Sequence, residues 1–131
     1  MANKVNDLRS ALELLKGIDG QLIETDVEVD PMAELSGVYR HIGAGGTVSR
    51  PTKEGPAMVF NNVKGHPGAR VAIGLLASRR RVGYLLDCDP KRLGFMLNDS
   101  VANPIAPQVI AEGEVAACQE VVYMADDPGF D

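Results

Sequence analysis

The sequence has few aromatic residues and no surplus of positive charge. Aromatic residues make up 5% of the 131 positions and tryptophan is absent, so we expect a core built mainly of aliphatic side chains. The formal net charge is −5. Proteins that bind nucleic acid neutralise phosphates with clustered Lys and Arg. This charge balance therefore argues against a nucleic-acid partner.

Long apolar runs and cysteine-rich patterns are also missing. No uninterrupted apolar stretch approaches the roughly 18 residues that suggest a membrane-spanning helix. No secretory leader precedes Asp7. The only cysteines are Cys88 and Cys118, which we expect to be two buried thiols in a reducing compartment, with a single disulfide as the alternative. Together these absences predict a cytoplasmic protein without a membrane partner.

What remains is the composition of an ordinary globular protein. Apolar residues make up 45% of the chain and charged residues 24%, which argues against disorder. The length suits one compact domain. We place an N-terminal α/β domain at residues 1–117 and expect residues 118–131 to begin the connection to a further domain that is absent from this chain.

The first half of the chain alternates helical and extended patterns. Asn6 or Asp7 can cap a helix, and residues 21–29 have strand character. Asp30-Pro31 is typical of a helix start, with Gly43 as its end. The first helix has an apolar stripe at helical spacing, formed by Leu8, Ala11, Leu12, Leu15 and Ile18. The second has an apolar face formed by Leu35, Val38, Tyr39 and Ile42.

The second half predicts two strands followed by two helices. Residues 57–63 and 70–76 read as strands joined by a turn, which favours a hairpin and leaves a mixed sheet possible. Ser78 can cap a helix to about Asp87, and Asp89-Pro90 starts another that runs to about Asn103. Residues 119–124 have strand character without an obvious partner. The predicted fold class is α/β (α+β), a small mixed β-sheet flanked by helices.

Residues 43–56 contain four glycines and two prolines and are predicted to form a long loop. The stretch from His41 to Thr47 superficially suggests a phosphate-binding loop. Such a loop must lead into a helix N-terminus, whereas these glycines follow a helix. We therefore favour a helix end that opens into a loop over a nucleotide site.

Arg79, Arg80 and Arg81 place three cations in the first turn of a helix, against the helix dipole. The arrangement indicates an anion or a carboxylate as partner, and Asp87, Asp89 or an acidic surface of another domain would serve. For at least two of the three arginines, simple exposure to solvent is the favoured interpretation.

No catalytic, cofactor-binding or metal-ligating residue can be assigned to this chain. His41 and His66 are the only histidines, and neither lies in a zinc-binding pattern. Asp26, Glu28 and Asp30 alternate along the first strand and its exit. They could form an acid–base pair, but a solvated strand face that ends in a helix cap is the ordinary interpretation.

Several motifs occur in the order found at the start of UbiD-type decarboxylases. They are Asp7-Leu8-Arg9, Val29-Asp30-Pro31 with Glu34, Gly55-Pro56-Ala57, Asn62-Val63-Lys64-Gly65 and Ser78-Arg79-Arg80-Arg81. Further stretches resemble the protocatechuate and gallate decarboxylase branch of that family. These are residues 38–47 with Arg50-Pro51-Thr52, then Gly55-Pro56-Ala57-Met58, Cys118-Gln119-Glu120 and Ala125-Asp126-Asp127-Pro128.

The resemblance implies a carboxy-lyase that converts 3,4-dihydroxybenzoate or gallate to catechol or pyrogallol and carbon dioxide. Members of the family use prenylated FMN with Mn²⁺ and K⁺. Their flavin-binding split barrel, metal ligands and proton-handling residues lie beyond the position of Asp131. We therefore expect this chain to be an N-terminal domain with a structural or assembly role, without chemistry or a bound cofactor of its own.

The resemblance also implies two partners, the C-terminal flavin domain of the same enzyme and further copies in a dimer or hexamer. One alternative is a free-standing interaction module that regulates or chaperones a decarboxylase. Another is an anion-binding module built on residues 43–47 and the arginine cluster. A domain parted from its neighbour should expose apolar surface, which we expect on the second helix and the last strand.

Overall fold

The structure is a computed structural model that describes residues 5–44, 54–107, 109–116, 118, 121–126 and 128. The chain divides into two compact units, residues 1–98 and 99–131. The helices and strands are, in order, α1 (Leu8–Lys16), β1 (Leu22–Thr25), α2 (Glu34–Ala44), β2 (Ala57–Phe60), β3 (Val71–Ile73), α3 (Arg79–Leu85) and α4 (Leu93–Ala102). None of these described helices is both long and apolar enough to cross a membrane.

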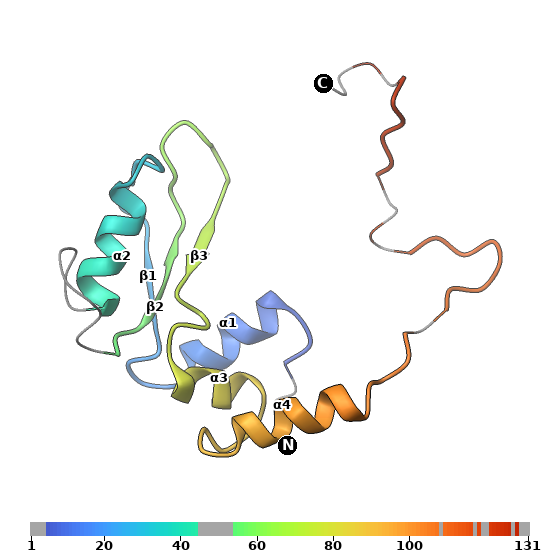
Figure 1. Cartoon of the computed structure of the whole chain (residues 1–131). Helices are drawn as coiled ribbons and strands as arrows, with labels where there is room; N and C mark the ends of the chain where they lie inside the picture. Colours follow the sequence, from blue (N-terminus) through green and yellow to red (C-terminus); the bar gives the residue numbers. More distant parts are fainter. Residues whose placement is uncertain are drawn as a thin grey trace. The chain divides into compact units, whose positions relative to one another are not determined.

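The three strands form one mixed sheet in the order β1-β2-β3 (Figure 1). β1 runs parallel to β2, with Leu22 opposite Ala57 and Thr25 opposite Phe60. β2 and β3 are antiparallel and form the predicted hairpin. The predicted small mixed sheet flanked by helices is therefore confirmed. Both the hairpin and the mixed sheet are present, because the parallel strand β1 adds to the hairpin.

The central strand β2 is buried along its whole length. Met58 and Phe60 belong to a core cluster with Val29 and Leu35, against which the predicted apolar face of α2 packs. Since side chains alternate along a strand, Val59 points to the opposite face, and it is buried as well. Burial on both faces explains why β2 reads in sequence as a continuous apolar run.

α1 begins as the sequence predicts. The Asp7 carboxylate accepts a hydrogen bond from the Ser10 backbone N–H at 2.7 Å, and Ser10 Oγ accepts one from the Asp7 N–H at 3.1 Å. This reciprocal capping box satisfies backbone donors that have no partner within the helix. Leu15, in the predicted apolar stripe, is completely buried.

All three strands are shorter than predicted, and β2 ends at Phe60 instead of residue 63. β1 ends at Thr25, and Val29 forms only an isolated bridge with Val63. β3 ends at Ile73 because Gly74 follows with a φ of 80°, which is outside the range of a strand.

The two Asp-Pro helix starts are displaced toward the C-terminus. The Asp30 carboxylate accepts the Met32 N–H at 2.8 Å, but Ala33 has a φ of 68° and α2 begins only at Glu34. α2 also ends at Ala44, one residue beyond the predicted end. After Pro90 the chain likewise makes a turn before α4 begins at Leu93.

The unit of residues 99–131 carries many exposed apolar side chains. The predicted strand over 119–124 is absent from residues 121–126, and the side chains from Val121 to Met124 are exposed. The expectation of exposed apolar surface on the last predicted strand is therefore confirmed. For the second helix it is wrong, because the apolar face of α2 packs against the sheet.

Candidate functional site

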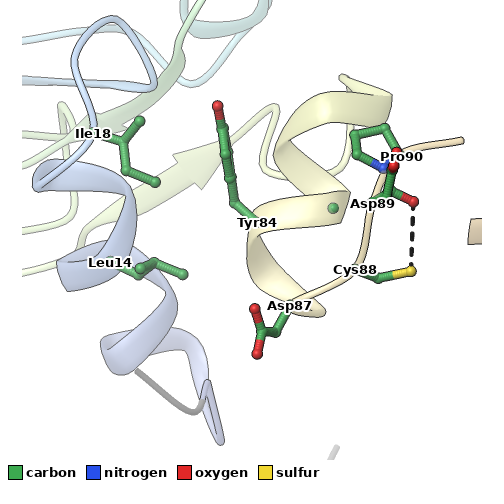
Figure 2. Close-up of a pocket in the computed structure, with 8 residues that line it drawn as sticks. Leu14, Ile18, Tyr84, Asp87, Cys88, Asp89 and Pro90 are labelled. Carbon is green, nitrogen blue, oxygen red and sulfur yellow. Dashed lines mark hydrogen bonds between the residues drawn. The ribbon is translucent and has the colours of Figure 1, made fainter. Parts of the chain in front are cut away.

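A pocket of about 410 Å³ lies between α1 and α3 (Figure 2). Leu14 and the neighbouring Ile18 face Tyr84 of α3 across it, and the turn that follows α3 supplies the remaining wall. That turn begins at Asp87, whose φ of 49° is uncommon for a residue other than glycine. The pocket is thus apolar toward α1 and polar toward the turn.

Gly83 allows the turn to approach α3 closely. A Cβ at this position would lie 2.7 Å from the Cys88 carbonyl oxygen and 3.0 Å from Pro90 Cγ. The Cys88 N–H donates to the Gly83 carbonyl at 2.9 Å. Any side chain at Gly83 would therefore push the polar wall of the pocket away from the helix.

The polar groups of Asp89 and Cys88 in this pocket are engaged in structural hydrogen bonds. Asp89 accepts the Lys91 N–H at 2.8 Å, and the Cys88 thiol lies 3.5 Å from the Asp89 carbonyl oxygen. The lining residues include no Lys, Arg or His. A nucleophilic thiol is activated by a histidine or a nearby cation, and this lining supplies neither.

The cysteines are not the buried pair that we expected. Both are free, Cys88 is half-buried and Cys118 is exposed. Cys118 lies in the unit of residues 99–131, where few side chains are buried, whereas Cys88 follows directly on α3. The apolar residues around Cys118 in the sequence suggested a core position that this unit does not provide.

The arginine cluster separates into one buried and two exposed side chains. Arg81 is 1% exposed, and its Nη1 and Nη2 donate to the carbonyl oxygens of Gly74 and Gly55, each at 2.5 Å. Burial lowers the pKa of the Arg81 guanidinium, and attraction to Tyr39 and Glu54 opposes that change. Among the described residues, Arg81 Nε has no hydrogen-bond partner.

The prediction of a carboxylate partner is therefore wrong for Arg81, because the hydrogen-bond partners of its guanidinium are backbone carbonyls. Arg79 and Arg80 are exposed, as predicted for two of the three arginines. The Arg79 Nε–H donates to the Pro90 carbonyl at 3.1 Å. Arg80 donates to the Tyr84 hydroxyl at 2.7 Å and lies over its ring at 5.6 Å from the centroid.

The acidic residues after β1 form structural contacts instead of an acid–base pair. Asp26 accepts the Asn61 side-chain amide at 2.9 Å. Asp30 accepts the Met32 N–H and also binds Lys64 Nζ at 3.0 Å. Both hydrogen bonds lower the pKa of Asp30, and the one from the Met32 N–H has the larger effect. The sequence alternation is misleading here, because the strand ends before Asp26.

A second pocket, of about 400 Å³, lies beside β1 on the face of the sheet that carries α2. We call it the β1 groove. Its apolar wall is formed by Ile23, Val27, Val29, Val38, Ile42, Met58 and Phe60. Thr25 and three glutamates, Glu24, Glu28 and Glu34, complete the lining. Sequence reasoning missed this groove, although the alternation of Ile23, Thr25 and Val27 indicates one half-covered face.

Neither pocket fits a flavin nucleotide or a metal ion. Phosphate binding needs cationic side chains or a helix N-terminus. Neither lining contains Lys or Arg, and the helix N-terminus that borders the β1 groove carries the anionic Glu34. Within the described ranges, no group of three or more His, Cys, Asp or Glu side chains is placed to hold a metal. His41 and His66 are both exposed. The loop predicted over 43–56, with most of the 43–47 motif, lies mainly outside the described residues.

Comparison with known proteins gives a consistent result. The profile of the 3-octaprenyl-4-hydroxybenzoate carboxy-lyase N-terminal domain matches residues 14–101. The chain is 59% identical over 131 residues to gallate decarboxylase of Lactiplantibacillus plantarum. This match covers 100% of this chain and 26% of the relative. It is 74% identical over 27 residues to 3,4-dihydroxybenzoate decarboxylase of Sedimentibacter hydroxybenzoicus, covering 21% of this chain and 96% of that sequence.

Solved structures agree with the sequence relatives. The apo 3,4-dihydroxybenzoic acid decarboxylase of Enterobacter cloacae matches with a TM-score of 0.80 and 57% identity, over 98% of this chain and 26% of its own. The apo enzyme from Klebsiella pneumoniae matches with a TM-score of 0.71 and 55% identity, over 77% of this chain and 21% of its own. The chain thus spans about a quarter of the full-length relatives it matches.

Proposed function

The chain belongs to the 3-octaprenyl-4-hydroxybenzoate carboxy-lyase (UbiD) family, whose N-terminal domain it matches. We propose that it is the N-terminal part of a non-oxidative aromatic-acid decarboxylase. The substrate is 3,4-dihydroxybenzoate or gallate, and the products are carbon dioxide with catechol or pyrogallol. The observation that carries the proposal is the 57% identity and TM-score of 0.80 to a 3,4-dihydroxybenzoic acid decarboxylase over 98% of this chain.

Within that enzyme, this domain has a structural and assembly role and contributes no catalytic residue. The lining of the two pockets described above supports this division, because neither supplies an activated nucleophile or a phosphate-binding cation. Prenylated FMN, with Mn²⁺ and K⁺, is held by the flavin domain, the partner to which residues 118–131 begin the connection. The flavin provides the electron sink that amino-acid side chains lack.

The assembled enzyme is a homo-oligomer, a dimer or a hexamer, in the cytoplasm. Free Cys88 and Cys118 suit the reducing conditions of that compartment.

The test compares the complete enzyme, supplied with prenylated FMN and metal, with the 131-residue chain. We expect the complete enzyme to release carbon dioxide from one or both acids, and the short chain to bind no flavin and release none. Carbon dioxide release is followed by loss of substrate absorbance, and flavin binding by visible absorption and native mass spectrometry. A loaded complete enzyme that is inactive on both acids would overturn the proposed activity. A short chain that is yellow and active would overturn the structural role.

A further inference from the structure

The β1 groove lies beside an open edge of the sheet. β2 pairs with one side of β1, and no described strand pairs with the other side. The Ala57 and Asn61 amides donate to the carbonyls of Gln21 and Thr25. Backbone groups alternate in direction along a strand, so Leu22 and Glu24 direct their N–H and C=O groups toward the open edge.

The groove and the open edge are arranged so that one extended segment could use both. Ile23 and Thr25 line the groove, while Leu22 and Glu24, which alternate with them, direct their backbone groups toward the open edge. A strand added to β1 would pair with Leu22 and Glu24 and place alternate side chains over the groove floor, at Met58 and Phe60. Val27 continues the apolar surface and is 74% exposed.

The charge of the groove selects the kind of segment. Its lining holds three glutamates and no cation. Glu24 is offset by Lys16 at 3.5 Å and Arg70 at 3.7 Å, whereas Glu28 is exposed at the rim. Two copies that met at this groove would bring two acidic linings together, which is unfavourable. A segment with a basic residue next to its apolar ones complements the groove.

We propose that the β1 edge and groove bind an extended, apolar segment with a flanking Lys or Arg, contributed by the part of the enzyme outside this chain. The inference rests on the proposed function, because that part comprises about three-quarters of the full-length relatives. Binding buries the exposed apolar side chains of the groove and satisfies the backbone groups of an otherwise open edge. The β1 groove is thus a docking surface between domains.

Amide hydrogen exchange tests the pairing directly. Exchange at Leu22 and Glu24 is measured in the 131-residue chain and in the complete enzyme, and we expect at least about tenfold slower exchange in the complete enzyme. Equal exchange in the two would overturn the proposal. The proposal would also be overturned if amide exchange at Leu22 and Glu24 slowed in the 131-residue chain as its concentration rises. A second copy would then be the occupant of the groove.

A matched pair of variants tests the groove within the complete enzyme. Val27 and Leu76 are each 74% exposed in this chain, but only Val27 lines the groove. We expect Val27→Asp to restore fast exchange at Leu22 and Glu24, and Leu76→Asp to leave it slow. Equal effects of the two variants would contradict the proposal. This comparison does not depend on how the short chain behaves alone.

Decarboxylation of both acids is measured on the same samples. An active complete enzyme in which Leu22 and Glu24 exchange rapidly would refute the docking surface and leave the proposed function intact. Slow exchange in a loaded but inactive enzyme would refute the activity and leave the docking surface intact.

Discussion

The guanidinium of Arg81 donates a hydrogen bond to the carbonyl oxygen of Gly55, a residue 26 positions earlier in the chain. The same side chain binds the carbonyl of Gly74, just beyond the end of β3. One buried cation therefore connects α3 to the segment just before β2 and to the segment just after β3. The direct partners are carbonyl oxygens, each of which presents the negative end of its dipole, and the Glu54 carboxylate adds a longer-range attraction.

Replacement of Arg81 by Met should destabilise the protein by about 3 kcal/mol, because two part-buried carbonyls lose a charged donor. Arg80→Met is the matched control, since Arg80 is exposed and its contact with Tyr84 is worth only about 0.5 kcal/mol. Urea denaturation followed by circular dichroism measures both free energies of unfolding. Losses of equal size would show that the carbonyl contacts of Arg81 contribute nothing of their own.

A second prediction concerns Gly74, which packs against the ring of Tyr39. Gly74 has a φ of 80°, and an added Cβ would overlap the Tyr39 ring. Gly65 has a similar φ of 77°, with no atom within 4 Å of an added Cβ. Gly65→Ala should therefore cost only the backbone strain, about 1–2 kcal/mol, and Gly74→Ala roughly 1–3 kcal/mol more for overpacking. Equal melting temperatures for the two variants would contradict this packing.

Much of the fold follows from local sequence signals. The cap at Asp7, the apolar face of α2 and the continuous apolar run of β2 each reflect a short-range pattern, and the structure confirms them. The helix start at Glu34 was misplaced because Asp30-Pro31 also suits a turn, and the positive φ of Ala33 cannot be read from an alanine. Strand ends likewise depend on pairing partners that lie far away in sequence.

The arrangement of sites was less predictable than the fold. A run of three arginines gives no sign of which one turns inward, and Arg81 is buried because Gly55 and Gly74 meet there from distant positions. The β1 groove also depends on long-range contacts, since Met58 and Phe60 complete the surface begun at Ile23. Sequence motifs identified the family, but three-dimensional contacts were needed to locate the pockets.

The two cysteines should react at different rates. Cys118 is exposed, whereas Cys88 is half-buried and directs its thiol toward the Asp89 carbonyl. A thiol reagent should therefore modify Cys118 first, with Cys88 slower by about tenfold because it requires local opening. Cys118→Ser should remove the fast phase and Cys88→Ser the slow one, while both thiols should react alike in urea. A single rate for the folded wild-type protein would contradict the assigned exposures.

The last prediction is a pH dependence that originates at Asp30. The Met32 N–H and the Lys64 ammonium bind its carboxylate and lower its pKa below the ordinary value of 3.8. Below that value the unfolded chain takes up a proton more readily than the folded one. The stabilisation from Asp30 is therefore complete above the ordinary pKa and is lost as the pH falls through the lower, folded value.

Asp30→Asn should accordingly lower the urea midpoint at about pH 7 and have a much smaller effect near about pH 2. Asp19→Asn, a change at another exposed carboxyl, serves as the control for the general effect of removing one surface charge. Lys64→Met should reproduce part of the effect at neutral pH, because it removes one of the two donors to Asp30. A loss of stability in Asp30→Asn that is equally large at both pH values would mean that the charge of Asp30 is not its source.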